Sequence, residues 1–197
     1  MNEVEAALRA GRPVVLPFDT VYGLAAEPHQ EESTRRLYEL KGRPARQPTA
    51  LVAASVAALL ELLPELDTTL AWHLLPGPVT LVVPNPAHRF PWLTGESPDT
   101  LGVRVPDLSG VTHDVVQRVG AVVATSANLP GRPDPRRLDD VPDTIRAGAA
   151  AVVDGGELPG TPSTVVDITG AEPRILRAGA VSEADVRRRL QAAVRSS

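Results

Sequence analysis

The chain has 197 residues and a formal net charge of −4, and 43% of its residues are hydrophobic but only 3% are aromatic. This length suffices for one large domain or two small ones with a buried core, and the negative net charge argues against broad non-specific binding to nucleic acid. The lack of cysteine excludes disulfides, a thiolate nucleophile and cysteine-ligated metals. We find neither a signal sequence nor an apolar run of membrane-spanning length, and therefore expect a soluble cytoplasmic protein that makes no membrane contact.

The N-terminal residues predict a helix, a strand and a polar loop. Residues 3–10 form a short amphipathic helix that ends at Gly11, and residues 13–17 form a buried strand bounded by prolines. Asp19 and Thr20 follow this strand directly, at the position where open α/β sheets place groups that contact ligands. The alternative is a turn in which both side chains bond their own backbone.

The next elements continue the alternation of helices and strands. A helix over residues 31–40 runs into the turn Lys41-Gly42-Arg43-Pro44. After it we predict a strand over 49–54, a helix from the cap Ser55 to 63, a helix from the cap Asp67 to Pro76, and a strand over 79–83. The Pro-rich residues 84–99 are predicted to form a mobile flap. Its Trp92 either anchors the flap or serves local packing, and we favour packing.

The second half of the chain repeats this alternation. Residues 100–106 predict a strand in which Arg104 stands where an apolar residue or a ligand contact belongs, and the apolar strand 121–125 ends in Ser126-Ala127-Asn128. The remaining predicted elements are a helix over 112–119, an exposed linker over 130–140, a helix near 141–147, strands over 149–154, 163–168 and 174–177, and a terminal helix capped by Ser182. This order predicts one layered α/β domain.

Lys41 is the single lysine of the chain, against nineteen arginines. A lysine at this one position suggests a function for which guanidinium is poorly suited, such as placing a compact positive charge next to a phosphate or carboxylate. Gly42 and Pro44 break the helical pattern, so we expect Lys41 and Arg43 to lie on a turn. The alternative is that these cations lie at the C-terminal end of the helix and only interact favourably with the helix dipole.

Several familiar sites are absent from the sequence. We find no phosphate loop with a Gly-Lys-Ser/Thr ending, no Gly-x-Gly-x-x-Gly after the first strand, no His-Glu-x-x-His and no metal-binding spacing among the four histidines. Ser126 does not lie in a Gly-x-Ser-x-Gly elbow, which argues against a serine hydrolase.

Polar and cationic side chains instead recur at predicted strand ends and turns. These are Thr20, Lys41, Arg43, Thr100, Arg104, Ser126, Asn128, Ser163 and Arg177. If they converge, they form a concave basic cavity suited to a polyphosphate and a small zwitterion. Phosphoryl and nucleotidyl transfer need mainly positioning and charge neutralisation, so the residues themselves predict an anion-binding α/β domain of the kind that nucleotide enzymes use.

Seven ordered stretches carry a resemblance to a known family. They are residues 17–24 (PFDTVYGL), 41–44 (KGRP), 76–80 (PGPVT), 102–106 (GVRVP), 125–128 (TSAN), 163–167 (STVVD) and 176–179 (LRAG). In this order they resemble the YrdC-like threonylcarbamoyl-AMP synthases of tRNA modification, in the short form without an additional C-terminal domain. The resemblance extends over about residues 4–190 and implies a single YrdC-like domain over 1–197. Its implied fold is α/β (α+β), a YrdC/RibB-like twisted mixed sheet with flanking helices.

The resemblance also implies a reaction and its participants. L-threonine, bicarbonate or CO₂, and ATP with Mg²⁺ would give threonylcarbamoyl-AMP and pyrophosphate. A separate transferase would then carry the threonylcarbamoyl group to the adenosine beside the tRNA anticodon, and transient contact with tRNA is possible. No protein-bound metal site is implied.

Site residues follow from the same motifs. Lys41 and Arg43 are the implied catalytic pair at the phosphates. The implied threonine-binding residues are Thr20, Arg104 and Ser163, and the implied nucleotide-binding residues are Lys41, Arg43, Gln47, Thr100, Ser126, Asn128 and Arg177. Two positions depart from the pattern: Phe18 replaces a threonine, and Gln47-Pro48-Thr49 replaces Asn-Pro-Leu.

Three other functions stay open. One is a module that binds tRNA or double-stranded RNA on a concave basic surface, whose affinity would fall steeply with salt. Another is a paralogue that adenylates a different carbamate, as in hydrogenase maturation, and the third is a homologue with a different ligand.

Overall fold

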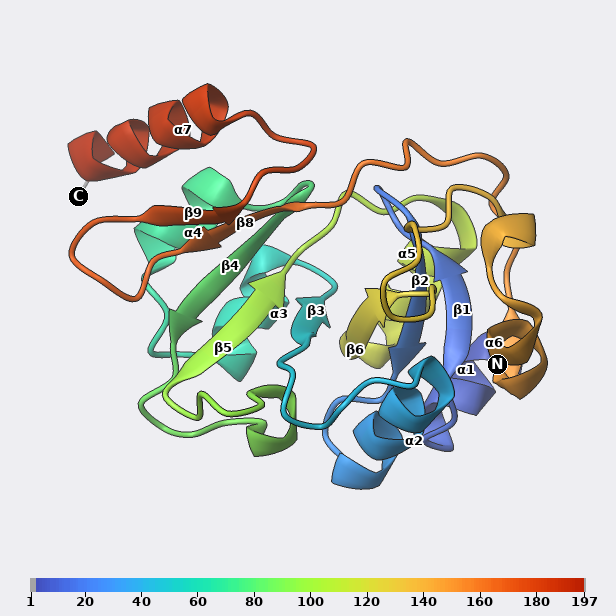
Figure 1. Cartoon of the computed structure of the whole chain (residues 1–197). Helices are drawn as coiled ribbons and strands as arrows, with labels where there is room; N and C mark the ends of the chain where they lie inside the picture. Colours follow the sequence, from blue (N-terminus) through green and yellow to red (C-terminus); the bar gives the residue numbers. More distant parts are fainter. Residues whose placement is uncertain (1–2, 197) are drawn as a thin grey trace.

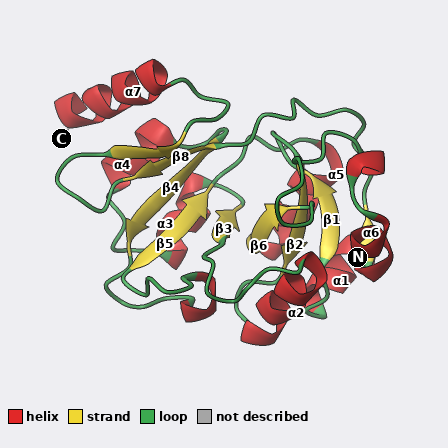
Figure 2. Ribbon diagram, in the orientation of Figure 1, coloured by secondary structure: helices red, strands yellow, loops and turns green. Residues whose placement is uncertain are grey.

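A single mixed sheet of nine strands runs through the protein, with helices packed against it (Figures 1 and 2). The computed structural model describes residues 3–196. The strands are β1 (Val14–Pro17), β2 (Tyr22–Ala26), β3 (Ala50–Ala53), β4 (Val79–Pro84), β5 (Thr100–Arg104), β6 (Ala121–Ser126), β7 (Ala151–Val152), β8 (Thr164–Asp167) and β9 (Arg174–Arg177). Their order is β7-β1-β2-β6-β3-β5-β4-β8-β9. Because β1–β7, β3–β5 and β4–β8 are parallel and the other neighbours antiparallel, the predicted mixed sheet is confirmed.

Seven α-helices lie within residues 3–196. They are α1 (Glu3–Arg9), α2 (Glu31–Lys41), α3 (Val56–Leu62), α4 (Thr68–Leu74), α5 (Gly110–Val119), α6 (Asp143–Gly148) and α7 (Glu183–Ser196), with short 3-10 turns at Pro91–Leu93 and Leu138–Asp140. The Ser55 hydroxyl accepts from the backbone N of Ala58 at 3.1 Å, and the Asp67 carboxylate accepts from that of Leu70 at 2.9 Å. The Ser182 hydroxyl likewise accepts from the backbone N of Asp185 at 3.2 Å. All three predicted caps are therefore confirmed.

Strand β2 was missed by the sequence analysis. It follows β1 in a hairpin whose loop is closed by a hydrogen bond from the backbone N of Phe18 to the carbonyl of Val21 at 3.2 Å. All five residues of β2 are buried, so the strand lacks the alternation of apolar and polar residues that marks a half-exposed strand. The hairpin places Asp19 and Thr20 at its tip.

Alternating side chains divide the sheet into two faces that are covered unequally. On one face Leu24, Leu51, Leu81, Val103 and Val123 belong to a large apolar core with residues of α2, α3, α4, α6 and α7. On the other face a smaller core joins Val14, Leu16, Ala25 and Val122 to residues of α1 and α5. The helices of the smaller core cover only part of this second face, and the uncovered part forms the cavity described below.

The predicted flap is held by a buried asparagine. The Asn85 side chain, which is 1% exposed, donates to the carbonyls of Arg89 and Pro98 and accepts from the backbone N of Arg89, at 2.9–3.0 Å. Trp92 packs against the large core and donates to the carbonyl of Pro28, 64 residues away, at 2.9 Å. These long-range contacts anchor the segment to the core, so the prediction of purely local packing was wrong. The mobility of this segment stays a prediction.

None of the helices within residues 3–196 is long and apolar enough to cross a bilayer.

Candidate functional site

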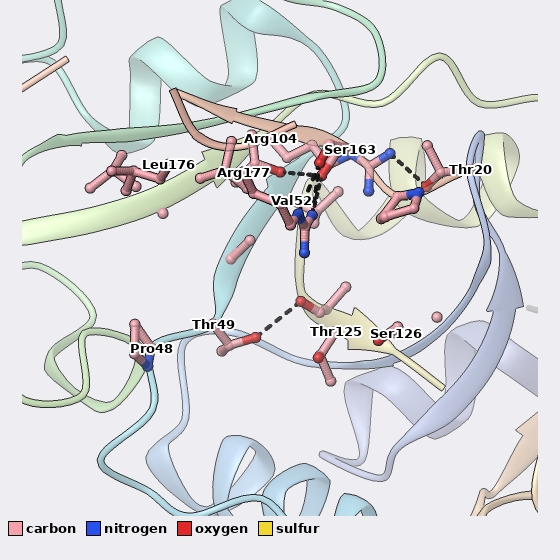
Figure 3. A pocket seen from close by; sticks show the side chains of 18 of the residues that line it. Thr20, Pro48, Thr49, Val52, Arg104, Thr125, Ser126, Ser163, Leu176 and Arg177 are labelled. Atoms are coloured by element: carbon pink, nitrogen blue, oxygen red, sulfur yellow. Dashed lines mark hydrogen bonds between the residues drawn. The ribbon is translucent and has the colours of Figure 1, made fainter. Parts of the chain in front are cut away.

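The uncovered part of the sheet lies beneath a cavity of about 630 Å³ (Figure 3). Its floor is made by small or β-branched side chains on neighbouring strands: Ala50, Val52, Val82, Gly102, Ala124 and Val165. All the residues that line the cavity lie on strands or loops. This volume lies in the range of small-molecule sites.

Cations and hydroxyls surround this apolar floor. The guanidinium-bearing residues of the lining are Arg43, Arg104, Arg174 and Arg177, and the hydroxyl-bearing ones are Thr20, Thr49, Thr80, Ser97, Thr100, Thr125, Ser126, Ser163 and Thr169. Two carboxylates, Asp134 and Asp167, lie among them. The lining is thus suited to an anion that also carries an apolar, flat part.

Arg104 connects β5 to the tip of the first hairpin. Its Nη2 donates to the Asp19 carboxylate. The same nitrogen donates to the Thr20 hydroxyl at 3.0 Å (Figure 3). The second carboxylate oxygen of Asp19 accepts from the backbone N of Asp107 at 3.1 Å. Burial lowers the pKa of Arg104, with Asp19 opposing this shift and Arg177 adding to it, while burial raises the pKa of Asp19 against the attraction of Arg104. The Asp19–Arg104 pair is thus largely removed from water.

Arg177 and Ser163 form a second polar group in the cavity. Arg177 donates to the Ser163 carbonyl at 2.8 Å through Nη2 and at 3.2 Å through Nε, and its Nη2 also donates to the Ser163 hydroxyl at 3.1 Å. That hydroxyl lies 2.8 Å from the hydroxyl of Thr80. Thr80 lies on β4, Arg177 on β9, and Ser163 directly precedes β8, so the pairing of these three strands brings the group together. Ser163 and Arg177 are seen close together in Figure 3.

Lys41 does not occupy the position predicted for it. It is the last residue of α2 rather than part of a turn, it is 4% exposed, and it is not among the cavity-lining residues. Its ammonium donates to the Ser126 carbonyl at 2.5 Å and to the Asn128 carbonyl and side-chain oxygen at 2.8 and 2.7 Å. The Asn128 side chain also accepts from the Ser126 hydroxyl at 2.6 Å. Burial lowers the pKa of Lys41 to about 8, and Arg43 contributes to this shift while Asp134 opposes it.

Arg43 and Gln47 both follow α2, but only Arg43 lines the cavity. The Arg43 guanidinium lies 6.0 Å from the Tyr38 ring centre, donates to the Pro48 carbonyl and lines the cavity, and burial lowers its pKa. The Gln47 side chain is exposed and is not part of the lining, and its carbonyl accepts from the Tyr38 hydroxyl at 3.1 Å. The structure thus does not bring Gln47 to the cavity.

Seven of the ten sequence-predicted site residues line the cavity. They are Thr20, Arg43, Thr100, Arg104, Ser126, Ser163 and Arg177. Lys41 and Asn128 are not among the lining residues and instead bond one another. Sequence reasoning placed Asp19 at a ligand-binding strand end but did not reveal its partner Arg104, and it missed the contribution of Thr80, which stands inside the motif of residues 76–80.

No protein-held metal centre is seen between residues 3 and 196, since no three His, Cys, Asp or Glu side chains there are grouped to hold a metal ion. The arrangement is suited to binding phosphates and carboxylates, because guanidinium groups form charge-assisted and often bidentate hydrogen bonds with both.

Comparison with known proteins decides the family. A family model for Sua5, YciO and YrdC, described as "Telomere recombination", matches residues 6–179. The chain belongs to this family. The resemblance carried by the seven motifs is therefore confirmed.

Individual relatives in the Sua5/YciO/YrdC family bear the name threonylcarbamoyl-AMP synthase. The Shigella flexneri protein is 38% identical over 175 residues, which cover 83% of this chain and 88% of the relative. The Pyrococcus abyssi protein is 34% identical over 181 residues, but the match covers 87% of this chain and only 52% of that relative. A crystal structure of P. abyssi Sua5 complexed with L-threonine superimposes with a TM-score of 0.85 at 32% identity, covering 94% of this chain and 56% of that one. The predicted fold class is confirmed by this similarity.

Proposed function

We propose that the chain is an enzyme, a nucleotidyltransferase that makes threonylcarbamoyl-AMP and pyrophosphate from L-threonine, bicarbonate or CO₂, and ATP. The observation that supports this most directly is the convergence of guanidinium and hydroxyl groups on one cavity of about 630 Å³. The family adds weight, because relatives similar over most of this chain are named for this synthase. We further propose that residues 1–197 act as a single domain.

The proposed chemistry proceeds in two steps. The threonine amine attacks the carbon of CO₂ and loses a proton, giving a carbamate. A carbamate oxygen then attacks the α-phosphorus of ATP, the bond from that phosphorus to the oxygen bridging the α- and β-phosphates breaks, and pyrophosphate leaves. Neither step needs a nucleophile from the protein, so its contribution is positioning and charge stabilisation.

The polar groups suggest where each substrate binds. Arg104, Thr20 and Ser163 would hold the carboxylate and hydroxyl of threonine. Arg43 and Arg177 would bind the phosphates, because both have guanidiniums in the lining and neither is paired there with a carboxylate.

The nucleotide's remaining contacts are proposed at the other side of the cavity. Thr100 and the Ser126 hydroxyl would bind the nucleotide, with the apolar floor beneath its flat base. Lys41 would contribute indirectly, by holding the segment from Ser126 to Asn128 in place, since its three acceptors all lie in that segment. We assign no role to Gln47, whose side chain is exposed.

Magnesium would enter as part of the substrate. The cavity has only Asp134 and Asp167 as carboxylates, and Asp167 already accepts from Arg174 at 2.6 Å and from the Thr169 hydroxyl at 2.6 Å. This donor set fits Mg²⁺ bound mainly by ATP phosphates. The product would pass to a separate transferase that modifies the adenosine next to the tRNA anticodon.

Pyrophosphate release tests the proposal. Purified protein would be given ATP, Mg²⁺ and bicarbonate, with and without L-threonine, and with L-serine to measure selectivity. Release that requires both threonine and bicarbonate is expected. ATP binding without such release would favour the paralogue that uses another carbamate, whereas no ATP binding together with salt-sensitive RNA affinity would favour the RNA-binding module.

A further inference from the structure

Asp19 is a buried carboxylate to which the proposed reaction gives no task. Its side chain is 8% exposed, and that of its partner Arg104 is 12% exposed. A charge buried to this degree is stable only when it is paired and hydrogen-bonded. Of the other groups near Arg104, Thr20 is neutral and Arg177 is a second cation that opposes its charge. Asp19 is therefore the counter-ion of Arg104.

Asp19 is itself held by the strand that carries Arg104. One carboxylate oxygen accepts from Arg104, the last residue of β5, and the other accepts from the backbone N of Asp107, three residues further on. The Arg104 side chain, the Asp19 carboxylate and the backbone from Arg104 to Asp107 thus form a small ring closed by these two hydrogen bonds. A ring anchored at both ends fixes the direction of the guanidinium more firmly than a single ion pair would.

The bonds to Asp19 and Thr20 occupy only one nitrogen of the guanidinium. Both use Nη2, whereas Nε is buried without a partner and Nη1 has no hydrogen bond among residues 3–196. A planar guanidinium held by one nitrogen keeps its remaining N–H groups in a defined plane, as carboxylate recognition requires.

We propose that Asp19 is a positioning residue, which orients the Arg104 guanidinium in the cavity so that the N–H groups of Nη1 receive the substrate carboxylate. This inference rests on the proposed function for the identity of that carboxylate. The orientation itself depends on the ring described above and is measurable without substrate.

A neutral substitution tests the orientation directly. In Asp19→Asn the size is kept, but the charge is lost and only one acceptor oxygen remains. We would record the arginine Nε–H signals by ¹⁵N NMR and assign that of Arg104 as the one lost in Arg104→Lys. A sharp signal, protected from solvent exchange, is expected in the parent protein and in the control Asp107→Asn, which keeps the backbone donor. The signal should broaden or vanish in Asp19→Asn, and an unchanged signal there would overturn the proposal.

Binding and turnover test the consequence for substrate. L-threonine titrations should give a dissociation constant about 10- to 100-fold higher for Asp19→Asn, because charged hydrogen bonds lose their alignment. KM for threonine should rise while KM for ATP, and kcat at saturating threonine, change by less than about threefold. A fall in kcat at unchanged KM would overturn the positioning role and make Asp19 a participant in the chemistry.

Asp19→Glu guards against a purely structural loss. It restores the charge, and its added methylene has room in a second cavity of about 310 Å³ that Asp19 also lines. Threonine affinity and the NMR signal should be closer to the parent values than in Asp19→Asn, and equal loss in both variants would contradict the proposal. A parent protein that binds no threonine would refute the proposed function, while the substrate-free NMR comparison would still decide the role of Asp19.

Discussion

Gly102 provides the sharpest test of where the ligand lies. It stands in the cavity floor, and a Cβ added there would meet the Thr49 carbonyl at 3.6 Å and Ala50 atoms at 3.7 and 3.9 Å, all ordinary contacts. Gly102→Ala and then Gly102→Val should therefore fold normally. Glycine within a strand costs about 0.5–1 kcal/mol relative to alanine, so the melting temperature should stay constant or rise by about 1–4 °C.

Ligand binding should change in the opposite direction. Overfilling a packed contact costs about 1–3 kcal/mol, which corresponds to an increase of about 5- to 150-fold in the dissociation constant of ATP for the valine variant, with a smaller increase for alanine. Calorimetric titration of ATP with Mg²⁺ and thermal denaturation without ligand measure the two effects separately. Unchanged ATP and threonine affinities in Gly102→Val would refute the assignment of this floor to the ligand. A lower melting temperature would refute the claim that the free protein has space for a side chain at position 102.

Three further predictions concern individual side chains. Arg43→Ala should lower kcat/KM for ATP by at least about 100-fold, the equivalent of two charge-assisted bonds at about 1.5–3 kcal/mol each, while circular dichroism stays unchanged; full pyrophosphate release would instead return Arg43 to a helix-end role. Because the pKa of Lys41 is about 8, its charge is present below that pH and lost above it. ATP affinity measured by calorimetry at pH 7, 8 and 9 should thus fall as pH rises, and a Lys41→Met variant that keeps the same slope would exclude Lys41 as the titrating group. Gly179→Ala would place a Cβ 2.3 Å from the Pro162 carbonyl and 2.5 Å from the Ser163 carbonyl carbon, so it should destabilise by about 1–3 kcal/mol and raise KM for threonine. Gly170→Ala, with its nearest atom at 3.9 Å, is the matched control, and equal urea midpoints for the two would contradict the prediction.

Local signals in the sequence accounted for most of the secondary structure. Ser55 and Asp67 cap helices as predicted, and Gly42 ends α2 in the left-handed conformation with φ of 66°. These features depend on neighbours within a few residues. Strand β2 was missed because its burial comes from partners on both faces of the sheet, and no pattern within five residues reveals such partners.

The sequence predicted most residues of the candidate site, but not which of them bond one another. The motifs identified the residues that line the cavity, yet they could not show that Lys41 bonds Ser126 and Asn128, some 85 residues away. The link between Asp19 and Arg104 spans a similar separation. The proximity of these residues depends on the strand order, which places β6 between β2 and β3 and β5 next to β3.

The burial of Lys41 also makes it a chemical reporter. As the only lysine, it carries the one side-chain amine of the chain, and 4% exposure shields it from amine-selective acylating reagents. Acylation of this amine requires its three acceptors to release it, so the labelling rate measures how often the segment from Ser126 to Asn128 opens. Mass spectrometry of the peptide that contains Lys41 would then measure how often this segment beside the cavity opens, without any engineered probe.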